Sequence, residues 1–355
     1  MNLSRFITSS RKNMGLPKTF VERFHEIESV RKMPYKQLGS TDLQISRLGF
    51  GGGSFSGFYG NFDDEKGVAT VIEAVKKGIN YIDTAPYYGE GRSEILLGKA
   101  LKHIPREAYY ISTKVGRYTT NWETMFDYSR EKILSGFEQS LKRLGLTYVD
   151  FAVVHDVEFN TLDDILKNAL PAVKELIAEG KVRYLAISGY PLSKLWEVIS
   201  KSDIKIDIVL TYSRDTLIDA SLYEYIPLFK SKGLGVIDAA PTAMRLLTNI
   251  GPPEWHPANQ KIKELCAQAA NYCKENGVEL GRLAIYHTLL NSEVENCLVG
   301  FNTMEQLHSN LDTLLNKLSE KEEDVLKHIK QKYFTLKENL EWEGVEIELY
   351  KKHKK

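Results

Sequence analysis

The chain alternates short apolar runs with longer amphipathic segments, and this alternation limits its fold more than any other feature. The runs are rich in β-branched and aromatic residues, as buried strands are. Eight of them occur, at 46–51, 79–84, 109–115, 149–155, 182–188, 206–210, 233–238 and 295–300. The segments between them have the spacing of amphipathic helices. Strands that alternate with helices pair in parallel, because a parallel connection needs a crossover.

Eight strand–helix units over about 250 residues favour an α/β fold of the (β/α)8 TIM-barrel type over an open, doubly wound sheet. A hairpin is predicted before the first unit, from 35–38 and 43–45, closing the floor of the barrel. Residues 239–294, between strands 7 and 8, hold a long loop and two extra helices. We therefore expect one barrel domain at 35–317, preceded by an extension at 1–34 that need not be ordered and followed by a C-terminal helix and tail at 318–355.

Polar residues and glycines predict where several helices begin and end. Ser93, Ser129, Thr161 and Thr303 each precede a helical pattern and are expected as N-caps, and Gly145 is expected to end the helix at 130–144. Near the C-terminus, residues 339–350 alternate partly and predict a late strand or loop, followed by a solvated basic tail.

Charge and composition exclude several classes of protein. Lys and Arg together number 47 and so do Asp and Glu, so the net charge is zero and neither nucleic acid nor a cationic partner is indicated. The sequence has no apolar run of the roughly 18 residues that a membrane span needs.

Three cysteines, Cys266, Cys273 and Cys297, cannot make a disulfide framework or a CxxC metal site, and we expect them to be buried. The cytoplasm is the expected compartment; the basic stretch at 1–21 leaves a mitochondrial presequence as an alternative.

Four reactive side chains follow successive predicted strands. Strands two, three and four end in Asp83, Lys114 and His155, and Tyr88 lies in the loop after Asp83. Each has an ordinary structural interpretation on its own. In a barrel, however, the carboxyl ends of the strands converge, so buried polar groups there must satisfy one another.

This combination is suited to proton transfer by a tyrosine. The ordinary pKa of tyrosine is about 10, too high for acid–base work near neutrality. We expect the Lys114 ammonium to lower the pKa of Tyr88, Asp83 to hold Lys114, and His155 to orient the reacting oxygen. No metal is needed.

The four residues resemble the catalytic tetrad of the aldo-keto reductases. The stretches around them support the resemblance, which runs from about residue 35 to 315: 47–52, 80–85, 141–150 and 180–185. It implies an oxidoreductase that binds a nicotinamide cofactor across the barrel mouth without a Rossmann domain. The stretches 112–118, 154–159 and 251–258 are similar to the branch that contains L-galactose dehydrogenase.

The resemblance also implies where the cofactor binds. Ser188 would hold the carboxamide, but Gly189 stands where the family has asparagine and Tyr212 where it has glutamine. The remaining predicted cofactor contacts are Gly52, Gly53, Ala240, Gly300, Asn302, Thr303, Gln306 and Asn310. For Asn310, an ordinary polar helix residue is the alternative. Residues 300–306 contain no basic side chain for a 2′-phosphate, and Glu305 would repel one, so NAD is expected over NADP.

Aromatic residues in the predicted mouth loops are the candidates for substrate contacts: Tyr87, Trp122, Phe126, Trp255 and His256. Each could equally be a packing residue.

The leading hypothesis is NAD-dependent oxidation of the C1 hydroxyl of an aldose such as L-galactose to its lactone, with the proton passing to Tyr88. One alternative is an NAD(P)H-dependent aldehyde or ketone reductase. Another is a nucleotide-binding protein similar to channel β subunits. A small sugar or carbonyl compound is the expected partner, with no nucleic acid, membrane or metal.

Overall fold

A closed barrel of parallel strands forms the centre of the molecule, as the sequence predicts. The computed structural model describes residues 15–336 and 338–354. Around the barrel the strands follow one another in chain order, and β10 closes onto β3. The strands are β3 (Leu48–Gly51), β4 (Tyr81–Asp83), β5 (Tyr110–Val115), β6 (Val149–Val154), β7 (Val182–Gly189), β8 (Ile208–Tyr212), β9 (Gly235–Ala239) and β10 (Asn296–Val299).

Helices surround the barrel and connect its strands. They are α2 (Asp64–Lys76), α3 (Arg92–Leu101), α4 (Arg130–Leu144), α5 (Leu162–Asp164), α6 (Leu170–Ala178), α7 (Leu192–Lys201), α8 (Leu222–Ser231), α9 (Gln260–Glu275), α10 (Leu280–Leu289), α11 (Met304–Leu315) and α12 (Glu320–Lys332). The short turns are η2 (Gly52–Phe55), η3 (Arg106–Ala108), η4 (Val157–Phe159) and the π-helical η5 (Ile165–Ala169), which separates α5 from α6. Helices α9 and α10 are the two predicted between strands 7 and 8 of the barrel.

Most of the predicted helix caps are confirmed. The side chains of Ser129, Thr161 and Thr303 accept backbone N–H groups in the first turns of their helices, and Gly145 ends α4 at a φ of 69°. The prediction for Ser93 is wrong, because α3 begins two residues earlier than expected, at Arg92 after Gly91. The Ser93 hydroxyl is buried instead and donates to the Gly52 carbonyl, 2.8 Å away.

Both faces of the barrel strands are buried, which explains why the strand sequences are nearly continuous runs of apolar residues. Inside the barrel, side chains such as Tyr81, Phe151 and Ile208 form one cluster. A second, larger cluster fills the space between the strands and the surrounding helices. The predicted burial of Cys266, Cys273 and Cys297 is confirmed.

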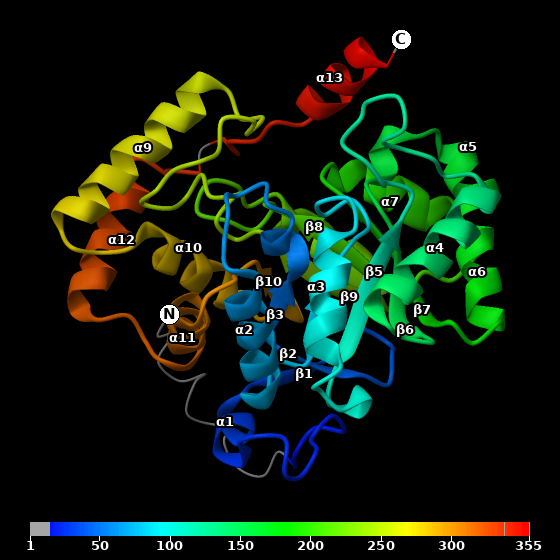
Figure 1. Ribbon diagram of the computed structural model, residues 1–355. Helices are drawn as coiled ribbons and strands as arrows, with labels where there is room; N and C mark the ends of the chain where they lie inside the picture. The colour runs from blue at the N-terminus through cyan, green and yellow to red at the C-terminus, as the bar shows by residue number, and fades with distance from the viewer. Residues whose placement is uncertain (1–14, 337, 355) are drawn as a thin grey trace.

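The amino end of the barrel is closed by the predicted hairpin. Its strands, β1 (Tyr35–Gln37) and β2 (Gln44–Ser46), pair antiparallel. Figure 1 shows α1 (Ile27–Lys32) beside this floor. Val30 and Met33 are buried there, and the Asn80 amide donates to Thr19, 3.0 Å away. Residues 15–34 are therefore part of the base of the barrel, whereas residues 1–14 of the expected extension and presequence lie outside the described residues.

The opposite end of the barrel carries a second helix of the C-terminal segment, beyond α12. The strand or loop expected at 339–350 is wrong: α13 (Val345–His353) lies above the carboxyl ends of the strands in Figure 1. The helix begins after Gly344, at a φ of 83°, and buries Tyr350 against Phe126 and Phe159. Its last turn includes part of the basic tail. Tertiary contacts of one aromatic residue thus outweigh a weak alternating pattern.

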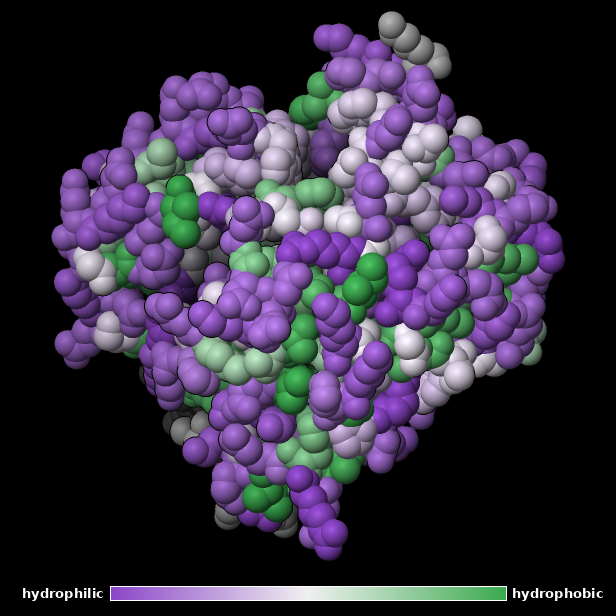
Figure 2. All heavy atoms as spheres, viewed as in Figure 1, coloured by the Kyte–Doolittle hydropathy of each residue, from purple (hydrophilic) through white to green (hydrophobic). Residues whose placement is uncertain are grey.

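The surface seen in Figure 2 is mainly hydrophilic, with hydrophobic residues in small separate spots. None of the helices within residues 15–336 and 338–354 has both the length and the apolar character needed to cross a bilayer.

Candidate active site

Asp83 and Lys114 form a buried ion pair at the carboxyl end of the barrel. Asp83 ends β4, and Lys114 lies near the end of the neighbouring β5. The Lys114 ammonium contacts one carboxylate oxygen of Asp83 and also donates to the Thr84 carbonyl, 3.0 Å away. The other Asp83 oxygen accepts from the Ser112 hydroxyl at 2.7 Å. With both side chains almost fully buried, these contacts hold the ammonium in one place.

Tyr88 lies directly beside this pair. The Lys114 nitrogen is 4.8 Å from the centre of the Tyr88 ring. Gly89 allows the chain to turn after Tyr88: its φ is 65°, and a Cβ there would lie 2.6 Å from the Ser56 carbonyl oxygen. The His155 ring stands edge-on to the Tyr88 ring, with centroids 6.0 Å apart. The structure therefore brings all four predicted residues together.

Burial raises the pKa of Tyr88 well above its ordinary value, and the negative charges of Asp83 and Asp156 add to this shift. The Arg117 charge opposes it. The sequence predicted the reverse, a pKa lowered by Lys114. That prediction is wrong for the protein alone, because burial dominates the shift and the charge of Asp83, which is paired with Lys114, adds to it. Tyr88 is therefore a neutral phenol near pH 7.

His155 is neutral in this site. Burial lowers the pKa of His155 to about 3, and the cations of Lys114 and Arg117 contribute, against the opposing charge of Asp156. Its Nε2 lies 3.5 Å from an Asp156 oxygen. Its Nδ1 is buried and has no hydrogen-bond partner among the described residues. A neutral imidazole can donate one N–H to a reacting oxygen, which is the role predicted for it.

Two charged residues of the site were missed by the sequence analysis. Arg117 donates to the Asp156 carboxylate at 2.7 Å, and its guanidinium lies 3.8 Å from the centre of the Tyr87 ring. Asp156 directly follows His155, and Arg117 comes two residues after β5. Scanning the first two residues past each predicted strand for charged side chains would have found both.

Three residues predicted to hold the nicotinamide lie at the ends of β7 and β8. Ser188 is buried, and its oxygen accepts the Asp156 N–H at 3.3 Å, which leaves its hydroxyl proton available. Gly189 ends β7. Tyr212 ends β8, and its ring packs against Tyr190 with centroids 5.2 Å apart.

The predicted glycine contacts place bare backbone at the mouth. A Cβ added at Gly53 would lie 3.8 Å from the Tyr88 ring, whereas one at Gly52 would collide with the Asp83 carbonyl at 2.7 Å. Gly300 follows β10 and lies next to Ser54. Ala240 follows β9 in a left-handed conformation, with a φ of 54°.

The predicted adenosine contacts gather at the start of α11. The Asn302 side chain donates to the Ser54 carbonyl at 3.3 Å, and its backbone N–H donates to the Gln306 side chain at 2.9 Å. The Thr303 oxygen accepts the Gln306 N–H. Asn310 is buried on the same helix. Asn302, Thr303 and Gln306 therefore form one connected group beside the end of β10, with Asn310 further along α11.

The five predicted substrate contacts separate into two groups. Tyr87 lies at the site, with its ring centre 6.2 Å from that of His155. The others contact neighbouring segments. Trp122 stacks on His353, Phe126 stacks on Phe159, and the Trp255 nitrogen donates to the Phe58 carbonyl.

The fifth, His256, is buried in its own loop. Its Nδ1 accepts the Ala258 N–H, and its Nε2 lies 3.0 Å from the Ala243 carbonyl oxygen. Burial lowers its pKa to about 4. Backbone groups of the loop thus occupy both ring nitrogens.

The C-terminal segment 340–353 crosses the barrel mouth. Trp342 stacks on Tyr190 with centroids 5.0 Å apart, and Arg214 donates to Glu343 at 2.6 Å. Burial and the charge of Asp156 raise the pKa of Glu346, while Arg117 and a hydrogen bond from Tyr212 oppose the shift. This segment therefore contributes to the walls of the site.

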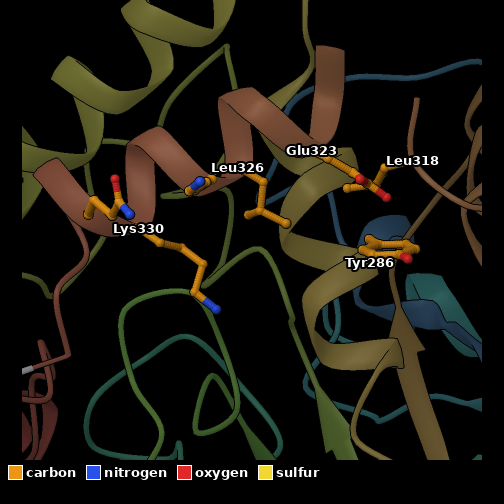
Figure 3. Close-up of a pocket in the computed structure, with 7 residues that line it drawn as sticks. Tyr286, Leu318, Glu323, Leu326 and Lys330 are labelled. Carbon is orange, nitrogen blue, oxygen red and sulfur yellow. The ribbon is translucent and has the colours of Figure 1, made fainter. Parts of the chain in front are cut away.

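An open hollow of about 400 Å³ lies elsewhere, between α10 and α12. Figure 3 shows Tyr286 of α10 and Leu326 and Lys330 of α12 beside it. None of the tetrad residues lines this hollow.

The barrel and the four clustered residues define an oxidoreductase of the aldo-keto type, and comparison with known proteins agrees. The chain belongs to the aldo/keto reductase family, whose model matches residues 47–331. It is 40% identical to L-galactose dehydrogenase of Arabidopsis thaliana over 79% of this chain and 88% of that protein. It is 34% identical to D-arabinose 1-dehydrogenase of Saccharomyces cerevisiae, over 84% and 93%. A solved aldo-keto reductase from Bacillus halodurans matches with a TM-score of 0.65 and 28% identity, over 84% of this chain and 96% of that one.

Proposed function

We propose that this protein is an NAD-dependent dehydrogenase that oxidises the C1 hydroxyl of an aldose, such as L-galactose, to the lactone. The observation that carries the proposal is the placement of Tyr88 between the Lys114–Asp83 pair and a neutral His155. The similarity to two aldose dehydrogenases supports a sugar as the substrate.

The residues at the mouth fit a nicotinamide dinucleotide. Ser188 retains a hydroxyl proton that it can donate to the carboxamide, and Gly53 presents bare backbone beside the Tyr88 ring. The group around Asn302, Thr303 and Asn310 would hold the adenosine end. A bound nicotinamide supplies the acceptor for the hydride that leaves C1.

The protein's own residues handle the proton of the C1 hydroxyl. Tyr88, as the phenolate, accepts this proton, and the neutral His155 positions the same oxygen by donating a hydrogen bond. Lys114 stabilises the phenolate from beside the ring, while Asp83 fixes the ammonium in place. The Arg117–Asp156 pair borders the substrate side of this arrangement.

NAD is the proposed cofactor because the start of α11 has no cation for a 2′-phosphate. Residues 300–306 contain no lysine or arginine, and Glu305 lies exposed in the first turn of the helix. A carboxylate there repels the additional charge that distinguishes NADP.

Reduction of aldehydes or ketones is the second candidate, and the raised pKa of Tyr88 favours it. A neutral phenol donates a proton, which is the step that carbonyl reduction requires. The same four residues serve either direction, so the preferred substrate decides between the two functions.

A substrate panel tests both proposals. L-Galactose, L-fucose and D-arabinose are oxidised with NAD or NADP, and simple aldehydes are reduced with NADH or NADPH. We expect the highest kcat/KM for a sugar with NAD. A higher value for an aldehyde would favour the reductase, and a higher value with NADP would overturn the cofactor preference.

A further inference from the structure

Gly189, at the end of β7, leaves a space that a carboxyl group from another element fills. A Cβ added at Gly189 would lie only 2.5 Å from Oε2 of Glu158, which belongs to η4. No side chain fits at position 189 unless Glu158 moves. The Glu158 carboxyl thus occupies the space beside the strand end that a side chain of residue 189 would otherwise take.

The two oxygens of the Glu158 carboxyl have different surroundings. Oε1 accepts the backbone N–H of Tyr190 at 2.9 Å. Oε2 is buried, and no group in the described part of the chain bonds to it. Buried polar atoms of proteins are nearly always hydrogen-bonded, so an unpartnered one beside an active site points to a ligand.

Its surroundings favour the neutral form of the carboxyl. Burial raises the pKa of Glu158 well above its ordinary value, and the charge of Asp156 adds to the shift, while the Tyr190 N–H opposes it. Because Oε1 already accepts a hydrogen bond, the proton belongs on Oε2. The group then has the shape and bonding pattern of a primary amide, with one accepting oxygen and one donor.

A planar donor at this place matches the carboxamide of a nicotinamide ring. Ser188, the residue before Gly189, has a hydroxyl proton free to donate, and its oxygen accepts the N–H of Asp156, two residues before Glu158. A carboxamide oxygen has two lone pairs and can accept both hydrogen bonds.

We propose that Glu158 binds the nicotinamide carboxamide, with Oε2–H donating to its oxygen next to Ser188. This inference rests on the proposed function, since it requires a nicotinamide dinucleotide at the mouth. It assigns to η4 a cofactor contact that Gly189 cannot make.

Equilibrium binding tests the inference without turnover. The quenching of tryptophan fluorescence measures the Kd of NAD and of ADP-ribose, which lacks the nicotinamide ring. We expect Glu158→Ala to weaken NAD binding about tenfold and to leave ADP-ribose binding unchanged. Glu158→Gln, which keeps both the acceptor and the donor, should bind NAD within about threefold of the wild type. The control Glu107→Ala, an exposed residue at the amino end of the barrel, should change neither Kd.

Two further variants test the same space from the strand side. Gly189→Ala should displace the carboxyl and weaken NAD binding selectively, even if Glu158→Ala folds poorly. The double variant Gly189→Asn with Glu158→Ala should regain most of the NAD affinity, because asparagine supplies an amide in the vacated space.

Three outcomes would overturn the inference: unchanged NAD affinity in Glu158→Ala, a parallel loss of ADP-ribose affinity, or a loss in Glu158→Gln as large as in Glu158→Ala. The proposed function fails separately, if the wild type binds neither NAD nor NADP, and the inference then fails with it.

Discussion

Asp150 at the amino end of the barrel and His155 and Glu158 at its carboxyl end differ in how fully they are hydrogen-bonded. At the amino end, the oxygens of Asp150 accept hydrogen bonds from Arg106, Arg183 and the Ile111 N–H at 2.7–3.0 Å. At the carboxyl end, the Nδ1 atom of His155 and Oε2 of Glu158 are buried without a partner in the described structure. The first arrangement stabilises the fold. The second leaves hydrogen-bonding capacity for a ligand.

The backbone shows the same contrast. At the amino end, the turns from helix to strand place glycines at positive φ: Gly78, Gly145, Gly180 and Gly233. At the carboxyl end, Gly89 and Gly116 take this conformation too. Most of the residues with side chains that take it also lie there, whereas the base has Arg23; those at the carboxyl end are Asp156, Ser213, Ala240, Ala243, Met244 and Arg245. Such conformations cost about 1–2 kcal/mol per residue, and they persist where the surrounding structure imposes them. The comparison predicts that changes at the mouth alter activity and changes at the base alter stability.

The largest effect is expected for Tyr88→Phe. Removing the hydroxyl removes the proton acceptor, so kcat should fall about 10³-fold. The Kd for NAD and the free energy of unfolding should stay close to those of the wild type, because only one oxygen is lost. Steady-state kinetics and fluorescence titration measure the two quantities. Activity within a small factor of the wild type would remove Tyr88 from the mechanism.

At the base, Asp150→Ala tests the other side of the comparison. It leaves Arg106 and Arg183 without their shared carboxylate, and we expect the free energy of unfolding to fall by about 3 kcal/mol. The kcat of the folded protein should not change. Urea denaturation checks the first expectation, with Asp203→Ala at an exposed position as the control. A large loss of kcat without a loss of stability would contradict the separation of the two ends.

Lys114→Met should lower kcat for oxidation about 10²-fold, because the phenolate of Tyr88 loses its nearest cation. The rise of the rate with pH should also move to higher pH. Lys114→Arg, which keeps a positive charge, should recover part of the rate. An unchanged pH profile in Lys114→Met would show that Lys114 does not tune Tyr88.

The wild-type protein should show opposite pH dependence in its two directions. Burial raises the pKa of Tyr88 above its ordinary value, so the phenol predominates at neutral pH and the phenolate forms as the pH rises. The oxidation rate should therefore increase up to about tenfold per pH unit above pH 7, while reduction stays flat or declines. Rates measured at saturating substrate provide the check. An oxidation rate independent of pH would indicate another proton acceptor.

The smallest effect concerns two fully buried alanines. Ala243 has a φ of 48° in the loop after β9, whereas Ala100 lies in the right-handed helix α3. Ala100→Gly should lower the free energy of unfolding by about 1 kcal/mol. Ala243→Gly should be neutral or stabilising, because glycine removes the left-handed strain. Equal losses in thermal or urea unfolding would mean that the mouth stores no strain at this residue.

Much of the fold was predictable because local patterns determine it. The apolar runs gave all eight barrel strands, with ends shifted by up to two residues, and Ser129, Thr161 and Thr303 marked helix starts correctly. The prediction at 339–350 failed because the burial of Tyr350, on residues distant in sequence, decides that α13 is a helix.

The sequence by itself determined the barrel and the convergence of Asp83, Tyr88, Lys114 and His155, because strand ends of a closed parallel barrel must meet. Only the tertiary structure decided the charge state of Tyr88 and the place of Glu158. The pKa of Tyr88 depends on burial and on the surrounding charges of Asp83, Asp156 and Arg117. The role proposed for Glu158 depends on its reaching the bare backbone of Gly189, 31 residues further along the chain. Distances across space, which no local pattern encodes, set both.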